Sequence, residues 1–320
     1  MKILYPSEYV FEKHAILRGL SQGEQFKRME AGFYGEEKFH QYLTKFGLEH
    51  WTILRNKWLK NDGHFECDFI VITRYAIYVF EVKNYFGKFV YKNGQSYSRG
   101  RAITYNPINQ ARNARLHLQQ ILPQYHVKGA LVFIGEHNQV CIKDVIEDIA
   151  ILETNEVYEF IQQIKREEQE YRGHYLNPQE VLTHLQKFEI DPPYHPAPYT
   201  RNEMKKARAG IYCANCQQKV LVTRADYIKC SCGLHESKEE AVIRTACEYG
   251  VLTYGEDFTV RDIYNFIGTG ISINYVKSTL DRHFNQVTDS KIMSFQNPNT
   301  NFNKIAKEFS FKLPKLSVLA

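Results

Sequence analysis

Two neighbouring segments alternate apolar and charged positions, and they predict two adjacent β-strands. They lie within Phe65 to Gly87, in the sequence FECDFIVITRYAIYVFEVKNYFG. Residues two apart on a strand point to the same side, so Glu81 and Lys83 share one face and the apolar residues beside them share the other. The first strand carries Asp68. Charged groups projecting from a buried sheet are costly unless they bind something, so these three residues predict a ligand site.

The flanking segments predict helices and further strands. Apolar residues at near-helical spacing indicate a helix over 32–46 with Glu36 in its first turn. Asn106-Pro107 begins a second helix, which carries Gln110. Asn93-Gly94 between alternating segments predicts a hairpin. The same patterns predict strands at 51–60, 127–135 and 148–154 and helices at 156–168 and 178–187. This order predicts an α/β domain built on a mixed sheet.

Four cysteines further along are paired as zinc ligands are. Cys213-x-x-Cys216 is followed after thirteen residues by Cys230-x-Cys232. Thiolates bind zinc tetrahedrally, and two close pairs can each hold one side of the ion. The stretch between the pairs alternates and predicts a hairpin, so the segment resembles a zinc ribbon, in which His235 is an alternative ligand. Four unrelated buried thiols and a redox pair are the competing interpretations, and the pairing favours structural zinc.

Three short helices are predicted between residues 237 and 287. Gly268-Thr269-Gly270 makes a tight turn between the second and the third. This arrangement resembles a helix-turn-helix bundle, in which Lys277 and Arg282 would lie on the exposed face of the third helix. Such units also bind proteins or simply pack, so DNA contact is one of three interpretations.

A proline-rich stretch separates these parts from the α/β domain. Residues 191–200 contain four prolines and predict a stiff linker, and the basic run that follows includes Lys205 and Lys206. That run is either a solvated helix start or a phosphate-contacting arm. The expected organisation is an α/β domain with an N-terminal arm (1–190), a linker (191–208), a zinc-ribbon-like segment (209–236), a helical domain (237–290) and a tail (291–320).

Composition indicates the class of partner and the cellular compartment of the protein. Of 320 residues, 41 are Lys or Arg and 36 are Asp or Glu, a net charge of +5 that only mildly favours a polyanionic partner. The seven cysteines do not form the pattern of a secreted disulfide framework. The first residues lack the apolar stretch of a signal peptide, and no run approaches the roughly 18 apolar residues of a membrane span. We therefore expect a cytoplasmic protein without membrane contact.

Residues of roughly 30–135 resemble the nuclease-related domain (NERD), which is grouped with the PD-(D/E)xK nucleases. The resemblance implies a restriction-endonuclease-like mixed sheet flanked by helices. Two departures are that Tyr75-Ala76 stands where the family usually turns through a glycine, and that no proline precedes Asp68. The features that carry the resemblance are Gly35-Glu36, Asp68 in ECDFIVI, Glu81-Val82-Lys83-Asn84 with Gly87 after it, Asn106-Pro107 with Gln110, and the strand ALVFIG.

The resemblance also implies roles for individual residues. Asp68 and Glu81 would ligate a divalent metal, and Glu36 would complete the metal shell. Lys83 would orient or activate the attacking water and stabilise the charge on phosphorus. Gln110 would support the site. Hard oxygen ligands suit Mg²⁺ or Mn²⁺, which is the chemistry that phosphodiester cleavage needs.

The expected function is therefore a metal-dependent nuclease that acts on DNA, with the zinc ribbon and the helical bundle gripping nucleic acid. A non-catalytic nucleic-acid-binding or regulatory protein that retains the fold is the alternative, and a protein-interaction scaffold is a third. The sequence leaves open DNA against RNA and a homo-oligomeric state. The residues expected to contact nucleic acid are Arg112, Arg115, Lys205, Lys206, Lys277 and Arg282.

Overall fold

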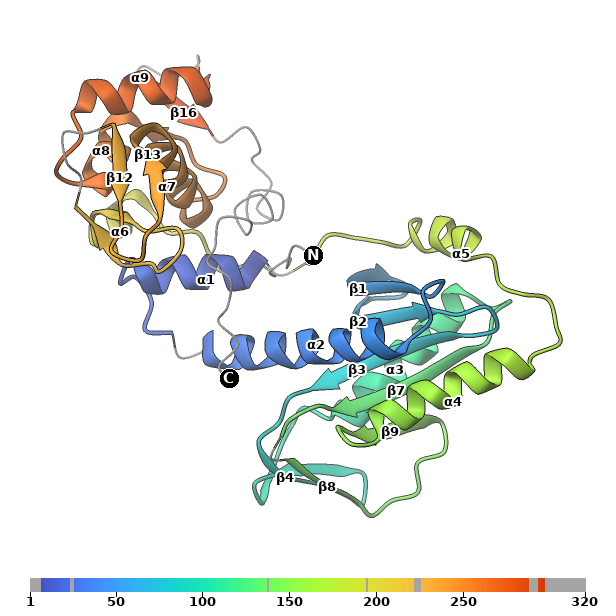
Figure 1. Ribbon diagram of the computed structural model, residues 1–320. Helices are drawn as coiled ribbons and strands as arrows, with labels where there is room; N and C mark the ends of the chain where they lie inside the picture. Colours follow the sequence, from blue (N-terminus) through green and yellow to red (C-terminus); the bar gives the residue numbers. More distant parts are fainter. Residues whose placement is uncertain are drawn as a thin grey trace. The chain divides into compact units, whose positions relative to one another are not determined.

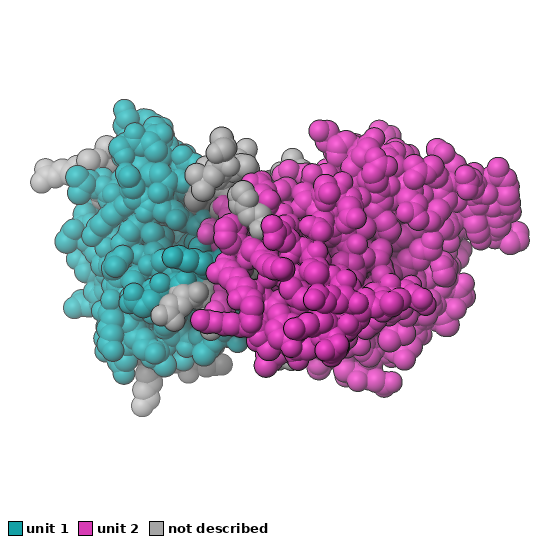
Figure 2. Space-filling view, turned by 90° about the horizontal axis from the view of Figure 1, so that it is seen from below, with its two compact units in different colours: residues 1–27, 194–320 teal, residues 28–193 magenta. Residues whose placement is uncertain are grey.

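The chain divides into two compact units (Figure 2). The computed structural model describes residues 7–23, 26–136, 138–193, 195–221, 226–287 and 293–296. Residues 28–193 form one unit, here called the central unit, and residues 1–27 with 194–320 form the other, the terminal unit. The N-terminal residues, expected as an arm of the α/β domain, are thus grouped with the C-terminal part of the chain.

The central unit is built on a five-stranded mixed sheet (Figure 1). Its strand order is β1-β2-β3-β7-β9, in which β1, β2 and β3 pair antiparallel and β3, β7 and β9 pair parallel. The bounds are β1 Thr52–Lys60, β2 His64–Ile72, β3 Ile77–Lys83, β7 Val127–Phe133 and β9 Ile149–Glu153. The predicted mixed α/β sheet and all five of its strands are confirmed.

Helices cover both faces of this sheet (Figure 1). On one face, α2 (Phe26–Phe46) and α4 (Val157–Glu170) pack on the side of the sheet that carries Tyr78 and Phe80. On the other face, α3 (Pro107–Ile121) and α5 (Pro178–Leu185) pack against the side that carries Ile77 and Val79. Asn106 caps α3 by accepting hydrogen bonds from two backbone N–H groups of its first turn, which is why the helix begins at Pro107.

A second, small sheet extends the central unit beyond the end of β3. Its order is β6-β5-β4-β8, with bounds β4 Gly87–Lys92, β5 Gln95–Ser98, β6 Arg101–Ala102 and β8 Asn138–Ile142. The hairpin predicted at Asn93-Gly94 joins β4 to β5, and both turn residues have the positive φ that such a turn requires. The strand β8 was not predicted, because its sequence, NQVCI, gives no clear alternation.

The terminal unit combines short helices with small sheets. Its helices are α1 (Ser7–Leu17), α6 (Arg201–Met204), α7 (Lys238–Leu252), α8 (Val260–Ile267) and α9 (Ile273–His283). Its strands are β10 (Ile211–Tyr212), β11 (Lys219–Val220), β12 (Tyr227–Lys229), β13 (His235–Ser237), β14 (Phe258–Thr259), β15 (Asn285–Val287) and β16 (Ser294–Gln296). None of the helices in the described ranges is both long and apolar enough to cross a membrane.

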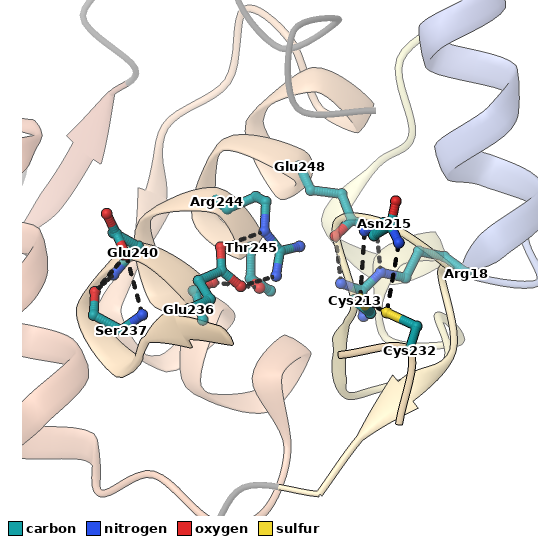
Figure 3. A network of polar contacts seen from close by, with 11 residues as sticks. Arg18, Cys213, Asn215, Cys232, Glu236, Ser237, Glu240, Arg244, Thr245 and Glu248 are labelled. Carbon is teal, nitrogen blue, oxygen red and sulfur yellow. Dashed lines mark hydrogen bonds and ion pairs between the residues drawn. The ribbon is translucent and has the colours of Figure 1, made fainter. Parts of the chain in front are cut away.

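A buried arginine ties α1 to the C-terminal part of this unit. Arg18 is fully buried, and its guanidinium donates two hydrogen bonds of 2.6 Å to the carboxylate of Glu248 on α7 (Figure 3). It also donates to the backbone carbonyls of Arg208 and Gly210, each at 2.9 Å, and lies 3.7 Å from the ring centroid of Phe266. These charge-assisted hydrogen bonds make the first helix an integral part of the unit.

The strand pairing around the cysteines differs from the prediction. A single hairpin was expected between the two cysteine pairs, but in the described residues β10 pairs with β11 and β12 pairs with β13. Each cysteine pair therefore has its own short hairpin. The three predicted helices are accompanied by a three-stranded sheet, β14-β16-β15, in which β14 lies between α7 and α8 and the other two strands follow α9. Most of the expected tail, 291–320, lies outside the described residues, and its residues 294–296 form β16.

Candidate active site

Glu81 and Lys83 form an ion pair at the end of the central strand β3. Their side chains share the sheet face that carries Val79, as the two-residue spacing predicts. Lys83 Nζ lies 2.5 Å from Glu81 Oε1, and the side chains are 16% and 2% exposed. Lys83 also donates a hydrogen bond of 2.9 Å to the hydroxyl of Tyr105. The lysine is thus held by two oxygen partners in a nearly buried position.

Asp68 lies beside this pair because the ladder between β2 and β3 stops next to it. The last paired residues are Phe69 and Phe80, and the same register continued by one residue would set Asp68 opposite Glu81. The backbone N–H of Val82 donates a hydrogen bond to Asp68 Oδ2, 2.7 Å away, instead of to a backbone carbonyl. The Asp68 side chain therefore takes the place of the backbone hydrogen bonds where β2 and β3 separate, and its carboxylate lies at that point.

A glycine brings the helix that carries Glu36 close to this point. An added Cβ on Gly35 would lie 2.7 Å from Asn84 Cβ and 3.0 Å from Ile134 Cγ2, too close for any side chain without movement. Asn84 in turn donates a hydrogen bond of 2.8 Å to the carbonyl of Ala31 on α2. The motif residues Gly35 and Asn84 thus fix the distance between α2 and the end of β3, and Glu36 is positioned by that contact.

The neighbouring strand is irregular at the same place. Asn56 on β1 has a left-handed backbone, with a φ of 48°, and its pairing with β2 is interrupted there, between Arg55↔Phe69 and Lys57↔Cys67. Its side-chain amide donates a hydrogen bond to the Glu36 carboxylate, which favours the ionised form. This interruption lies opposite Asp68. At Asp68, therefore, β2 is paired neither with β1 nor with β3.

The acids raise one another's pKa values. Burial is the main cause, and the charges of Asp68 and Glu66 add to it, so the pKa of Glu36 rises to about 8. Burial also raises the pKa of Asp68, and burial together with the Asp68 charge raises that of Glu81 well above its usual range. Burial lowers the pKa of Lys83, but Glu81 and Asp68 outweigh it and raise the pKa above its ordinary value. The lysine therefore stays protonated.

The comparison with protein families identifies this segment. Residues 31–134, which contain all of these groups, match the family model described as the nuclease-related domain. The central unit carries a nuclease-related domain. This confirms the resemblance seen in the sequence, over about the same residues. No curated protein and no solved structure matches the chain.

The acids of the nuclease-related domain suit a divalent cation by their chemistry. They supply hard oxygen donors, and Glu36 Oε2 is buried with no hydrogen-bond partner among the described residues. Burial is the main cause of their raised pKa values, and neighbouring acids add to it at Glu36 and Glu81, so a bound cation would favour the ionised carboxylates. Asp68 and Glu81 are tied to Val82 and Lys83 instead of to one another. Glu36, Asp68 and Glu81 are the residues that could hold the ion, although their carboxylate oxygens do not form a group as close as that of the cysteine thiols described below.

The structure adds Tyr105 to the site. Tyr105 binds Lys83 through its hydroxyl, and its ring centroid lies 4.9 Å from the ammonium nitrogen. Sequence reasoning missed it, because a single aromatic residue in a loop carries no spacing signal. Gln110 lies in the first turn of α3, and its Oε1 is buried with no hydrogen-bond partner in the part of the chain that the structure describes. Its supporting role stays a prediction.

Three of the six residues predicted to contact nucleic acid form ion pairs with acidic residues. Arg112 pairs with Asp148 at 2.9 Å, Lys277 with Asp281 at 2.6 Å and Arg282 with Glu239 at 2.8 Å. These pairs are more than a quarter exposed on both sides and exchange readily with water. Arg115 lines a pocket of about 410 Å³ at the opposite end of β7 from Lys83, and Lys205 and Lys206 are exposed. Their contacts with nucleic acid stay predictions.

The cysteines of the terminal unit form the second candidate site. The ligand atoms of Cys213, Cys216, Cys230 and Cys232 all lie within 4.8 Å of one another, and no other such group of three or more occurs among the described residues. His235 does not belong to the group. Burial raises the pKa of Cys213 to about 12, whereas a backbone N–H donor lowers that of Cys232 to about 6. Four thiols at this separation can hold one zinc ion.

The raised pKa of Glu36 gives a stability prediction. The pKa of Glu36 is about 8 in the folded protein against an ordinary 4.5, so its ionisation opposes folding. The resulting loss of folding free energy is absent below pH 4.5 and grows as the pH rises to 8. We expect Glu36→Gln to raise the free energy of unfolding of metal-free protein by about 2 kcal/mol at pH 9 and by almost nothing at pH 4.5. Urea unfolding in EDTA across this range measures it.

Glu37→Gln is the matched control on the same helix. Glu37 pairs with Arg55 at 2.5 Å, so its loss removes an attraction and should not stabilise the protein at any pH. Mg²⁺ should raise the melting temperature of the unaltered protein more than that of Glu36→Gln. A Glu36→Gln variant that is less stable than the unaltered protein at pH 9 would contradict the raised pKa of Glu36.

Proposed function

We propose that the central unit is a metal-dependent nuclease that hydrolyses phosphodiester bonds, with DNA as its preferred substrate. The observation that carries the proposal is a series of electrostatic contacts inside the segment that matches the nuclease-related domain. Asp68 raises the pKa values of Glu36 and Glu81, and Glu81 and Asp68 raise that of Lys83. The alternative is a non-catalytic nucleic-acid-binding protein with the same fold.

The roles of the side chains follow from their protonation and contacts. Asp68 and Glu81 would hold Mg²⁺ or Mn²⁺ and Glu36 would complete the oxygen set. A bound divalent cation lowers the pKa of the attacking water and neutralises phosphate charge. Lys83 stays protonated, so it donates hydrogen bonds to the water and to the phosphate oxygens and does not accept the proton. Tyr105 and Glu81 hold the ammonium group in place for that role.

A cleavage assay with the full chain tests the proposal. Supercoiled plasmid, linear duplex, single-stranded DNA and RNA are incubated with the protein in Mg²⁺, in Mn²⁺ and in EDTA. We expect cleavage of at least one DNA substrate in a divalent metal and none in EDTA. Salt-sensitive binding of DNA without metal-dependent cleavage of any substrate would support the non-catalytic alternative instead.

We propose that the four cysteines hold a structural zinc ion. The prediction is one zinc per chain in purified protein, measured by elemental analysis, because four thiolates satisfy the ion completely. Cys216→Ser should lose most of the zinc and Cys247→Ser, a cysteine outside the group, should keep it. Full zinc content in Cys216→Ser would contradict the site.

We further propose that the terminal unit grips nucleic acid. In chain order, α7, β14, α8, α9 and the hairpin β15–β16 give the topology of a winged helix-turn-helix, with α9 as the helix available for a groove. Asn274 and Ser278 are exposed on α9 beside Lys277. The ion pairs of Lys277 and Arg282 would have to open for contact with phosphate, so the binding is expected to weaken steeply with salt.

A further inference from the structure

The segment that follows the candidate catalytic residues is strongly basic. Residues 82–135 contain eight Lys or Arg and no Asp or Glu, whereas the rest of the chain has 33 basic and 36 acidic residues. Lys88, Lys92, Arg99 and Arg101 are exposed on the small sheet or its turns. These four residues give the small sheet that follows β3 a basic surface suited to a polyanion, whereas Arg115 and Lys128 lie at the other end of β7.

Two exposed aromatic rings lie within this basic surface. Phe86 follows Lys83 by three residues and is 63% exposed, and Tyr105, which is bonded to Lys83, is 47% exposed. Single exposed apolar side chains are common, but aromatic rings within a basic surface are the combination that binds single-stranded nucleic acid. Gly87 has a φ of 87°, which only glycine adopts readily, and the resulting turn at the start of β4 leaves Phe86 outside the core.

The Phe86 ring and backbone contact Arg99, in the turn after β5. The Arg99 guanidinium carbon lies 5.4 Å from the Phe86 ring centroid, and its Nε donates a hydrogen bond of 3.2 Å to the Phe86 carbonyl. The backbone N–H of Arg99 also bonds the carbonyl of Lys88, at 2.9 Å. The turn after β5 is thereby fastened to the segment between β3 and β4. A ring held in this way needs little ordering when a flat partner stacks on it.

We propose that Phe86, Tyr105 and the basic residues around them bind an unpaired DNA strand and lead it to Lys83. Base faces are open for stacking only when the strand is unpaired, since a duplex buries them between neighbouring base pairs. Lys88, Arg99 and Arg101 supply the charge that follows a phosphate backbone. The inference rests on the proposed nuclease function, and it names single-stranded DNA as the substrate class of that site.

Binding in the absence of cleavage tests this inference. Fluorescence anisotropy in EDTA compares a labelled oligothymidylate of about 15 nucleotides with a duplex and an oligouridylate of the same length. We expect the full chain to bind oligothymidylate more tightly than the duplex. Phe86→Ala should weaken oligothymidylate binding by about 5- to 100-fold, because one stacking contact is lost, and should change duplex binding by less than about twofold.

The chain offers a closely matched control. Tyr175 is an aromatic residue of the same unit that is 60% exposed, with the Arg74 guanidinium 5.8 Å from its ring centroid, and it lies outside the basic segment. Tyr175→Ala should leave oligothymidylate affinity unchanged, and Phe86→Trp should retain it. The new indole should also be quenched on binding.

The outcomes separate this inference from the proposed function. Tighter binding of duplex or of oligouridylate, or a Phe86→Ala affinity equal to that of Tyr175→Ala, would overturn it. If Lys83-dependent cleavage occurs while Phe86→Ala binds normally, the nuclease proposal stands and this inference fails. If Phe86→Ala loses binding and no substrate is ever cleaved, the binding surface stands and the nuclease proposal fails.

Discussion

Replacement of Lys83 by methionine is expected to reduce metal-dependent DNA cleavage by at least about 10²- to 10³-fold, the effect of removing one preorganised donor at a reacting phosphate. Methionine keeps the apolar length of the side chain but removes the charge and the hydrogen bond to Tyr105. The loss should fall on the rate of cleavage under saturating substrate. Single-turnover cleavage of a labelled substrate measures it.

Lys128→Met is the control for this experiment, because the surroundings of Lys128 resemble those of Lys83. Lys128 Nζ lies 2.7 Å from Glu167 Oε2 and 5.2 Å from the ring centroid of Tyr75, as Lys83 lies near Glu81 and Tyr105. It belongs to the start of β7, at the other end of the sheet. Equal cleavage by both variants would reject the catalytic role of Lys83, provided that their circular dichroism spectra match that of the unaltered protein.

Replacement of Arg18 by methionine is expected to destabilise the terminal unit by about 3–5 kcal/mol, the usual cost of leaving one member of a buried ion pair behind. Glu248 is 1% exposed and would keep its charge with His14, 3.3 Å away, and the more distant Arg244 as ionisable neighbours. The central unit does not contain these residues and should keep its stability. Hydrogen exchange resolved by peptide measures the two units separately.

The pH dependence of this effect identifies its cause. Burial raises the pKa of Glu248, but Arg18 and His14 lower it to about 2. The stabilisation by this carboxylate is therefore complete above pH 4.5 and is lost as the pH falls toward 2. The difference between Arg18→Met and the unaltered protein should be largest near neutral pH and should shrink below pH 4.

An arginine with an exposed ion pair serves as the control. Arg201 lies 3.9 Å from Asp262, and its side chain is 46% exposed. Arg201→Met should cost less than about 1 kcal/mol at every pH, because water compensates for the lost partner. If Arg18→Met costs no more than Arg201→Met, the first helix is not fastened to the unit by this contact.

The sequence predicted those parts of the fold that depend on neighbouring residues. The Asn93-Gly94 hairpin, the cap of α3 at Asn106 and the buried strand β7 each follow from local turn chemistry or from a short apolar run. The place of α1 could not be predicted, since it depends on Arg18 meeting Glu248, 230 positions away. The pairing of the cysteine hairpins was missed because alternation does not say which strand is the partner.

The candidate site shows the same division. Asp68, Glu81 and Lys83 were predicted from the charge pattern of the two strands, and Glu36 from the resemblance to the nuclease-related domain. Tyr105 was missed because its bond to Lys83 joins residues 22 positions apart. The charge of residues 82–135 is visible in the sequence, but the exposure of Phe86 beside it is not.

The terminal unit combines N-terminal and C-terminal segments of the chain, which affects the order in which the two units can fold during synthesis. A ribosome adds about 5–20 residues per second, so roughly 10–50 s pass between the emergence of Arg18 and that of Glu248, 230 residues later. During this interval the nascent chain carries α1 without its partner, while residues 28–193 are already complete and able to fold. The nuclease-related domain would then mature first, and α1 would be a site for chaperones until α7 has been synthesised.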